Sequence, residues 1–211
     1  VVKPAAHFSV IAQNIYTINP VENNDYVKLL AAIKKDGLAP SHIVHLWSES
    51  VFANELTVIN EQVNISLISV LLLSQSLLTS GIKSKLVLLF VYLTTLDKEQ
   101  PVFAALAAFA KTLTLEYAQI DCRVLEIQSA ETSFAFLNSL SAIVFAELQT
   151  TEKNRLHVRY EQERRMVKTI TKVNNKQTNS AAPTLLKPQG VYIITGGMGN
   201  LGFIFAEYLA S

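Results

Sequence analysis

The sequence predicts an α/β protein in which a mainly parallel sheet is covered by helices on both faces. Two observations predict this class. Short apolar segments alternate with longer segments of helical periodicity along residues 8–150, and strands that alternate with helices form parallel sheets through right-handed crossovers. In addition, Lys85–Leu93 is almost continuously apolar, which is typical of a parallel strand that is buried on both faces.

The elements begin with two short strand candidates, Phe8–Ile11 and Ile15–Ile18. A helix follows and extends to about Asp36. Asn23–Asp25 provide candidate N-cap residues for this helix, and Gly37 provides its C-cap. The segment therefore predicts two strands followed by an amphipathic helix.

The rest of the first domain continues the alternation. We expect strands at His42–Trp47, Lys85–Leu93 and Cys122–Ile127, and helices at about Leu56–Ser80, Val102–Tyr117 and Glu131–Gln149. Gly81 closes the long helix, and Pro101 stands where the next helix begins. Alternating residues in Leu156–Tyr160 and Arg165–Ile170, with the charged Glu161–Arg164 between them, predict a β-hairpin.

The sequence divides into three parts. Residues 1–172 have the pattern of a truncated Rossmann-like domain that ends in the hairpin. Val173–Pro188 is polar, contains two prolines and lacks periodicity, so we interpret residues 173–189 as a linker. Residues 190–211 have the pattern of the first βα unit of a second Rossmann fold.

This last part contains a glycine motif. Val191–Thr195 predicts a buried strand, and the apolar spacing after Leu201 predicts a helix. Gly197, Gly199 and Gly202 between them fit G-x-G-x-x-G in strand–turn–helix context. In this motif the three glycines permit the tight turn, the approach of a pyrophosphate and the packing of helix on strand. The alternative is a glycine-rich turn that permits only close packing.

The first domain lacks such a motif. Of the seven glycines, five lie in the final 22 residues, and the other two, Gly37 and Gly81, are predicted C-caps. In the turn after the second strand, Glu22 and Asp25 would repel a phosphate. We therefore predict that the first domain binds no cofactor.

Composition excludes several classes. The net charge is +1, which disfavours a general nucleic-acid or acidic-membrane surface. The single Cys122 excludes an internal disulfide and fits a cytoplasmic protein. The apolar runs Leu67–Leu73 and Leu86–Leu93 are shorter than a membrane span, and no signal peptide is recognised. We expect neither a nucleic acid nor a membrane as partner.

No catalytic or metal site is predicted. His42 and His45, three residues apart on a strand, should lie on opposite faces. Ser48 beside Glu49 lacks a positioned base, so we interpret it as a helix cap or turn. Cys122 is interpreted as a core thiol. Two further groups are predicted to be solvated: Lys111 and Glu116 on a helix, and the hairpin charges Glu152, Arg155, Arg159, Glu161, Glu163, Arg164, Arg165 and Lys168. For the hairpin, contact with a carrier protein or a neighbouring domain is the alternative.

The segment Thr195-Gly196-Gly197-Met198-Gly199-Asn200-Leu201-Gly202 resembles the TGGxGxLG loop of ketoreductase domains in modular polyketide synthases, a branch of the short-chain dehydrogenases. Asn200 departs from the glycine that is usual in the wider superfamily. Further similarity lies, in order, in Tyr16–Pro20 with Tyr26–Leu30, in His42–Ser48, in Ala107–Tyr117, and in the hairpin residues Val158–Tyr160 and Arg164–Arg165.

The resemblance implies a cofactor-free structural subdomain followed by the start of an NADPH-binding catalytic subdomain. It implies cofactor contacts at Thr195, Gly196, Gly197, Met198, Gly199, Asn200, Leu201 and Gly202. The family reduces the β-keto group of a chain held on an acyl carrier protein. Its catalytic Lys, Ser, Tyr and Asn would follow Ser211, and no Tyr-x-x-x-Lys occurs before it. We therefore expect this chain alone to be inactive and to bind no NADPH.

The expected partners are the remainder of the ketoreductase, neighbouring synthase domains and the carrier protein with its β-ketoacyl chain. Two alternatives remain open. One is a non-catalytic pseudo-ketoreductase that acts as a scaffold between synthase domains, and the other is an unrelated nucleotide-binding module.

Overall fold

The computed structural model describes residues 1–48, 52–81, 84–95, 100–128, 134–152, 156–161, 164–172, 186–187 and 189–210, with the backbone alone for residues 134–138. The chain forms two compact units, Val1–Thr169 and Ile170–Ser211. The predicted linker lies outside the described residues except for Leu186, Lys187 and Gln189, as does the predicted helix start at Glu131.

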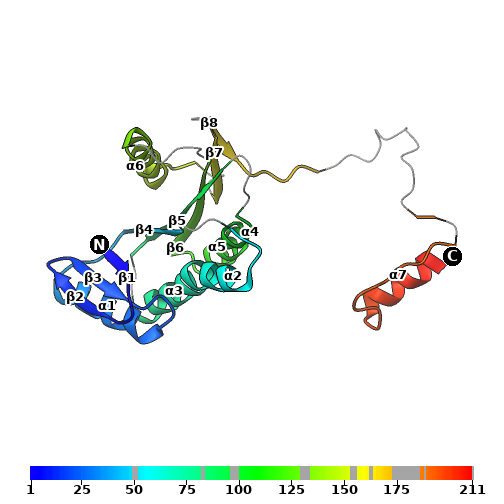
Figure 1. Cartoon of the computed structure of the whole chain (residues 1–211), viewed down its shortest axis with the longest axis horizontal. Helices are drawn as coiled ribbons and strands as arrows, with labels where there is room; N and C mark the ends of the chain where they lie inside the picture. The colour runs from blue at the N-terminus through cyan, green and yellow to red at the C-terminus, as the bar shows by residue number, and fades with distance from the viewer. Residues whose placement is uncertain are drawn as a thin grey trace. The chain divides into compact units, whose positions relative to one another are not determined.

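The first unit contains both sheets and most of the helices (Figure 1). In chain order its elements are β1 (Val2–Pro4), β2 (Ser9–Ala12), β3 (Ile15–Ile18), α1 (Asn23–Lys35), β4 (His42–Ser48), α2 (Leu56–Val63), the π-helix η1 (Asn64–Ile68), α3 (Ser69–Thr79), β5 (Leu86–Thr94), α4 (Pro101–Ala104), α5 (Leu106–Glu116), β6 (Ile120–Gln128), α6 (Phe134–Gln149), β7 (His157–Glu161) and β8 (Arg164–Val167). The second unit contains α7 (Asn200–Ala210).

The larger sheet has five strands in the order β4-β5-β6-β7-β8. β4 to β7 are parallel, and β8 pairs antiparallel with β7 in the predicted hairpin. The three central strand predictions are therefore confirmed, including their adjacency. A mostly parallel sheet formed by strands that alternate with helices confirms the predicted truncated Rossmann fold.

The amino-terminal strands do not join the mainly parallel sheet that the sequence predicts. They form a separate sheet in the order β1-β3-β2. The physical reason is that β3 has both edges occupied: β1 pairs with it in parallel and β2 antiparallel. Neither edge of β3 remains for β4. The three-residue β1, which contains Pro4, was not predicted because so short a segment has no visible period.

Helices cover both faces of the larger sheet, as predicted. On one face, Val70 and Leu77 of α3 and Leu106 of α5 join the core around Phe90. On the other face, α6 packs on β5, β6 and β7, with partly buried Ile143 against buried leucines and valines of the strands. Figure 1 shows α6 on the side of the sheet opposite to α3 and α5.

The predicted helix Leu56–Ser80 is a continuous helix of 24 residues, Leu56–Thr79, with a π turn in its middle. Its most apolar window has a mean hydropathy of 1.6. By length and composition this helix could cross a membrane. The sequence does not predict this, because the apolar run Leu67–Leu73 within the helix is shorter than a membrane span. A helix in the core of a protein can have the same length and the same apolar composition. Here Ser69 and Val70 are fully buried against the sheet.

The helix ends agree with the sequence predictions at both C-caps but differ at the N-cap of α1. Gly37 and Gly81 have φ of +72° and +75°, the left-handed conformation of the predicted C-caps. The N-cap of α1 is Glu22, whose carboxylate accepts a hydrogen bond from the Asn24 N–H. The predicted N-cap candidate Asp25 lies in the first turn, where it is buried and accepts a hydrogen bond from the Asn19 N–H at 3.0 Å.

Candidate functional site

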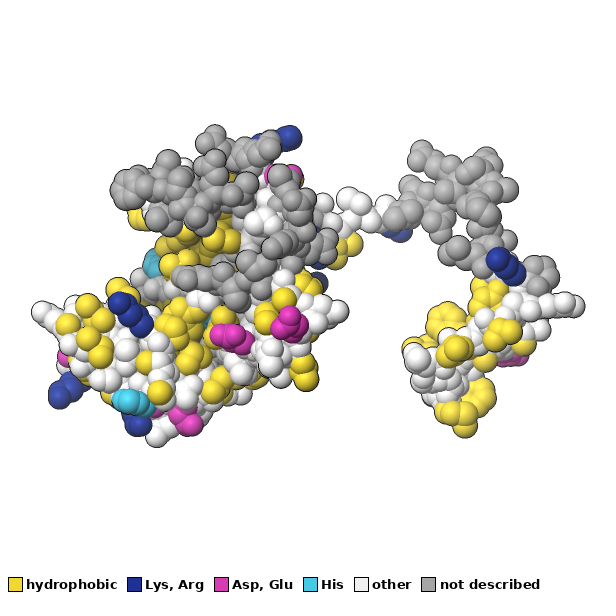
Figure 2. All heavy atoms as spheres, in the orientation of Figure 1, with side chains coloured by type: hydrophobic (Ala, Val, Ile, Leu, Met, Phe, Trp, Pro, Cys, Tyr) yellow, Lys and Arg dark blue, Asp and Glu magenta, His cyan; other side chains and the backbone are white. Residues whose placement is uncertain are grey.

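Val191–Thr195, predicted as a buried strand, forms no strand in the structure. Val191 and Ile193 are 93% and 91% exposed, and Figure 2 shows hydrophobic side chains on the surface of this second unit. A strand exists only when a neighbour supplies the ladder of hydrogen bonds, and no described residue pairs with this segment. The apolar pattern was recognised correctly, but the strand prediction is wrong for this chain.

The glycine-rich turn after this segment leads directly into α7. Gly196 has φ of +75°, so the left-handed residue of the turn is Gly196 rather than Gly197. The Gly199 N–H donates to the Gly196 carbonyl at 2.9 Å, and the Phe203 N–H donates to the Gly199 carbonyl at 3.0 Å. The turn is therefore closed by its own backbone before the helix begins.

Gly202 holds the helix against the turn. A Cβ at this position would lie 2.5 Å from the Cα of Gly197 and 2.6 Å from the carbonyl oxygen of Gly196. Both are backbone atoms that cannot rotate away. The geometry gives Gly202 the packing role of the third motif glycine.

Gly199 has a more open environment. A Cβ here would meet only one atom, the Gly196 carbonyl oxygen at 3.3 Å. Packing within the unit thus requires glycine at 202 far more strictly than at 199. The second motif glycine lets a ligand approach the backbone, and the open surroundings of Gly199 fit that role.

The loop is accessible. Thr195, Gly196, Met198, Gly199, Asn200 and Leu201 are exposed, Gly197 is half-buried and Gly202 is buried. The first N–H groups of a helix lack intrahelical partners and form the positive end of its dipole. The open backbone beside Gly199 and the start of α7 together fit the pyrophosphate of a dinucleotide.

The corresponding turn of the first unit does not fit a phosphate. Its Asn19 N–H is already bonded to the Asp25 carboxylate, which also lies 3.5 Å from the Lys28 amine. A second anion would meet that buried carboxylate rather than free N–H groups.

Other candidate residues take structural positions. His42 is exposed and His45 is buried on the opposite face, as predicted. The His45 Nε2 lies 2.8 Å from the Ser69 hydroxyl, and burial lowers the pKa of His45 to about 4. Ser48 is wrong as a cap, because it ends β4 and is buried. Glu49 lies outside the described residues.

Metal and thiol chemistry are equally unsupported. Among the described residues, no three His, Cys, Asp or Glu side chains group to hold a metal ion. Cys122 is 1% exposed, and burial raises the pKa of its thiol to about 12. It is the core thiol that the sequence predicts. Lys111 and Glu116 are exposed, also as predicted.

The hairpin contains an ionic cluster that the sequence did not reveal. Arg165, predicted to be solvated, donates to both carboxylate oxygens of Glu147 and to Glu152. Glu147 has a side chain only 3% exposed and also accepts from the Tyr160 hydroxyl at 2.9 Å. The cluster ties α6 to β7 and β8. Its partners are 13 and 18 residues apart in sequence, beyond any local pattern.

A second polar cluster lies at the carboxyl ends of the strands. Glu126 accepts from Tyr92 at 3.1 Å and from Thr94 at 3.2 Å. Arg159 and His157 stand 3.6 Å from its carboxylate, slightly beyond hydrogen-bond length. Burial alone would raise the pKa of Glu126, but the interactions with His157, Arg159, Tyr92 and Thr94 lower it below its ordinary value.

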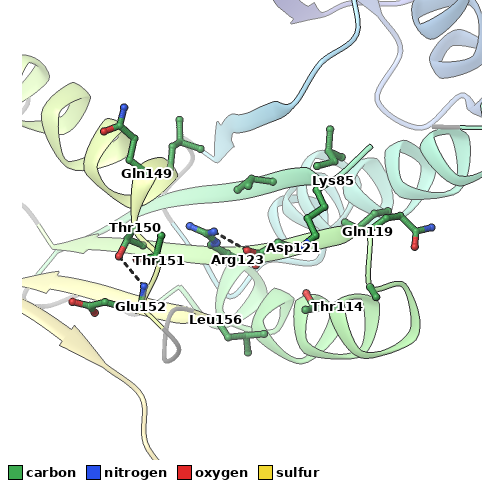
Figure 3. A pocket seen from close by; sticks show the side chains of 15 residues that line it. Lys85, Thr114, Gln119, Asp121, Arg123, Gln149, Thr150, Thr151, Glu152 and Leu156 are labelled. Atoms are coloured by element: carbon green, nitrogen blue, oxygen red, sulfur yellow. Dashed lines mark hydrogen bonds and ion pairs between the residues drawn. The ribbon is translucent and has the colours of Figure 1, made fainter. Parts of the chain in front are cut away.

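A pocket of about 600 Å³ opens at the amino ends of β5 and β6 (Figure 3). Its most deeply buried polar side chain, Arg123, is paired with Asp121 at 2.6 Å and donates to the Glu147 carbonyl. Ligands of open α/β sheets bind at the carboxyl ends of the strands. This pocket lies at the other end, so the glycine loop remains the candidate site.

Comparisons with known proteins identify the family of the chain. The model of the family described as "Beta-ketoacyl synthase-like, N-terminal" matches residues 1–143. The chain belongs to this family. Two curated polyketide synthases of Bacillus subtilis (strain 168) are similar to this chain. Polyketide synthase PksN is 31% identical over 118 residues, and polyketide synthase PksL is 30% identical over 126 residues. These matches cover 56% and 57% of the chain but only 2% of each synthase.

Solved structures that resemble this chain include ketoreductases. An N-terminal ketoreductase from the macrolactin assembly line has a TM-score of 0.78 and 25% identity, over 99% of this chain and 41% of that one. A multidomain structure with adenylation, ketoreductase and pseudo-Asub domains has a TM-score of 0.82 at 20% identity, over 99% of this chain and 18% of that one, which shows the shared fold. The resemblance to polyketide synthase ketoreductase domains is confirmed.

Proposed function

We propose that this chain is the structural subdomain, with the first βα unit of the catalytic subdomain, of a polyketide synthase β-ketoreductase. The complete domain reduces the β-keto group of a chain held on an acyl carrier protein. Residues 1–172 brace the catalytic subdomain, and the loop Thr195–Gly202 holds the pyrophosphate of NADPH. Neighbouring synthase domains and the carrier protein are its partners, in the cytoplasm.

The observation that supports this proposal best is the difference between the two glycines. Gly202 is required by packing, because its Cβ would overlap the backbone of Gly197. Gly199 faces a single atom and is exposed. Close packing alone would require glycine at 199 far less strictly than at 202, whereas a phosphate-binding turn requires it at both positions.

The chain's own residues act by binding. When bound, NADPH would supply the hydride that the keto carbon accepts. The N–H groups at the start of α7 would bind its phosphates, and the backbone at Gly199 would leave room for them. No Tyr-x-x-x-Lys occurs before Ser211, so we assign protonation of the substrate to the remainder of the ketoreductase.

The test is an NADPH titration followed by fluorescence, with a ketoreductase domain extended beyond Ser211. Gly199→Val should abolish binding, because a branched side chain would fill the space of the pyrophosphate. Ala206→Val is the matched control, since Ala206 is exposed one and a half turns into α7. Normal affinity in Gly199→Val would refute the loop's role.

Reduction of a β-keto thioester by the same extended protein distinguishes the alternatives. Turnover that needs NADPH supports a reductase. Binding without turnover would favour a pseudo-ketoreductase scaffold. The 211-residue chain itself should not bind NADPH at micromolar concentration: one helix N-terminus contributes about 0.3–1 kcal/mol toward an anion, whereas micromolar affinity requires about 8 kcal/mol.

A further inference from the structure

The outer edge of β4 has unused hydrogen-bonding groups. The Val87 N–H donates to the Ser41 carbonyl at 2.9 Å, and the parallel register continues through Ile43 and His45. Alternate residues of a parallel strand bond to opposite sides. The N–H and C=O groups of His42 and Val44 therefore point away from β5, and no described strand pairs with them.

The other sheet edges have features that prevent pairing. β1 contains Pro4, which lacks an N–H, and β2 has an irregular register between Val10 and Ala12. β8 is short and begins with the exposed Arg164. Prolines, bulges and charged residues are the devices by which proteins protect exposed edges. β4 contains no proline and no Lys, Arg, Asp or Glu. Its one register irregularity lies between His45 and Ser48, after the outward-pointing groups of His42 and Val44.

A groove of about 330 Å³ runs beside this edge. It is lined by β4, by α1 through Leu29 and Ile33, by β1 through Val2, and by Leu73 of α3. The only ionisable side chains among its lining residues are His42, His45 and Tyr26, and no Lys, Arg, Asp or Glu contributes. Buried His45 and Tyr26 are neutral, because burial lowers the pKa of His45 and raises that of Tyr26. The groove therefore favours an uncharged occupant.

We propose that the free edge of β4 receives an extended polypeptide strand from elsewhere in the parent protein, with apolar side chains at alternate positions. The main-chain groups of His42 and Val44 would bond to this strand, and the apolar wall of α1 and β1 would cover one of its faces. This is β-strand addition, in which main-chain bonds give affinity and side-chain pockets give selectivity.

The length of the synthases that the chain resembles supports an external strand. The chain spans 2% of the curated synthases that it matches, so such proteins have ample polypeptide to supply one. The inference rests on the chain being part of a larger synthase, as proposed above, but not on nucleotide binding or reduction. A loss of NADPH binding would leave it unaffected.

Hydrogen exchange tests the inference directly. The amides of His42 and Val44 should exchange rapidly in the 211-residue chain and at least about tenfold more slowly in the longer polypeptide that contains it, because a paired edge opens less often. Equally rapid exchange in both would refute the proposal. Slow exchange in the short chain that depends on its concentration would show pairing with a second copy instead, and would also refute it.

A pair of variants provides a second test. Val44→Pro removes an N–H that points to the groove and spares the bonds between β4 and β5. The control is Val167→Pro in β8. The Lys168 N–H donates to the His157 carbonyl of β7. Because successive residues of a strand bond to opposite sides, the Val167 N–H points away from β7, and its loss also spares the sheet. In the longer polypeptide, Val44→Pro should lower the melting temperature more than Val167→Pro, and it should restore rapid exchange at His42. If Val44→Pro and Val167→Pro lower the melting temperature equally, in the longer polypeptide as in the 211-residue chain, no strand binds at β4.

Discussion

Arg165 should be essential for the stability of the first unit. It has a half-buried side chain and supplies the charge that compensates Glu147, whose side chain is 3% exposed. Arg165→Leu would leave this carboxylate with only the Tyr160 hydroxyl as a described side-chain donor. Removing one partner of a buried ion pair costs about 3–5 kcal/mol, which corresponds to a fall in melting temperature of roughly 6–20 °C in a domain of this size.

Urea unfolding followed by circular dichroism measures this cost. Arg164→Leu is the matched control, because Arg164 is the exposed neighbour in the same strand and should change stability by less than about 0.5 kcal/mol. The double variant Glu147→Leu/Arg165→Leu should recover part of the loss, since it removes the uncompensated charge. If Arg165→Leu were as stable as Arg164→Leu, the cluster would be a solvated surface after all.

Three further outcomes are expected. Gly202→Ala should weaken NADPH binding by the extended ketoreductase about tenfold or more, since overpacking costs about 1–3 kcal/mol; unchanged affinity would mean that the turn and α7 adjust freely. Cys122 should resist alkylation at pH 8 in the folded chain and react only after unfolding, because its thiol is buried with a raised pKa; rapid labelling of the native protein would contradict this. His45 should make the fold less stable as the pH falls from about 6.5 toward 4, because the unfolded chain takes up a proton that the buried imidazole accepts only near pH 4. The loss of unfolding free energy between pH 6.5 and 4, measured in urea titrations, should be smaller in His45→Asn than in the unaltered protein. An equal loss in the two proteins would show that His45 does not cause it.

Much of the fold follows from patterns within single segments. The unbroken apolar run of β5, the glycines after α1 and α3, and the proline before α4 each have a local cause, so their elements could be predicted from sequence. The order of β4, β5 and β6 also followed, because right-handed crossovers place successive parallel strands side by side. The glycine motif was visible for the same reason, although its role in binding stays a prediction.

The features that were missed depend on contacts between distant segments. β3 does not join the larger sheet because β1 and β2 pair with both of its edges. This pairing cannot be recognised from the sequence of any single segment. Residues 191–194 have the composition of a strand, but strand formation requires a partner. Arg165 resembles its exposed neighbour Arg164 in sequence, and only the position of Glu147 on α6 distinguishes them.

The strictly sequential order of the larger sheet has a consequence for synthesis on the ribosome. Each strand from β5 to β8 pairs with the strand made just before it, so the sheet can grow by one strand as each new segment emerges. In this sheet no described strand must wait for a partner from far downstream, so pairing can proceed while translation continues. In a very long polypeptide, such a unit can be folded before the domains that follow it have been translated.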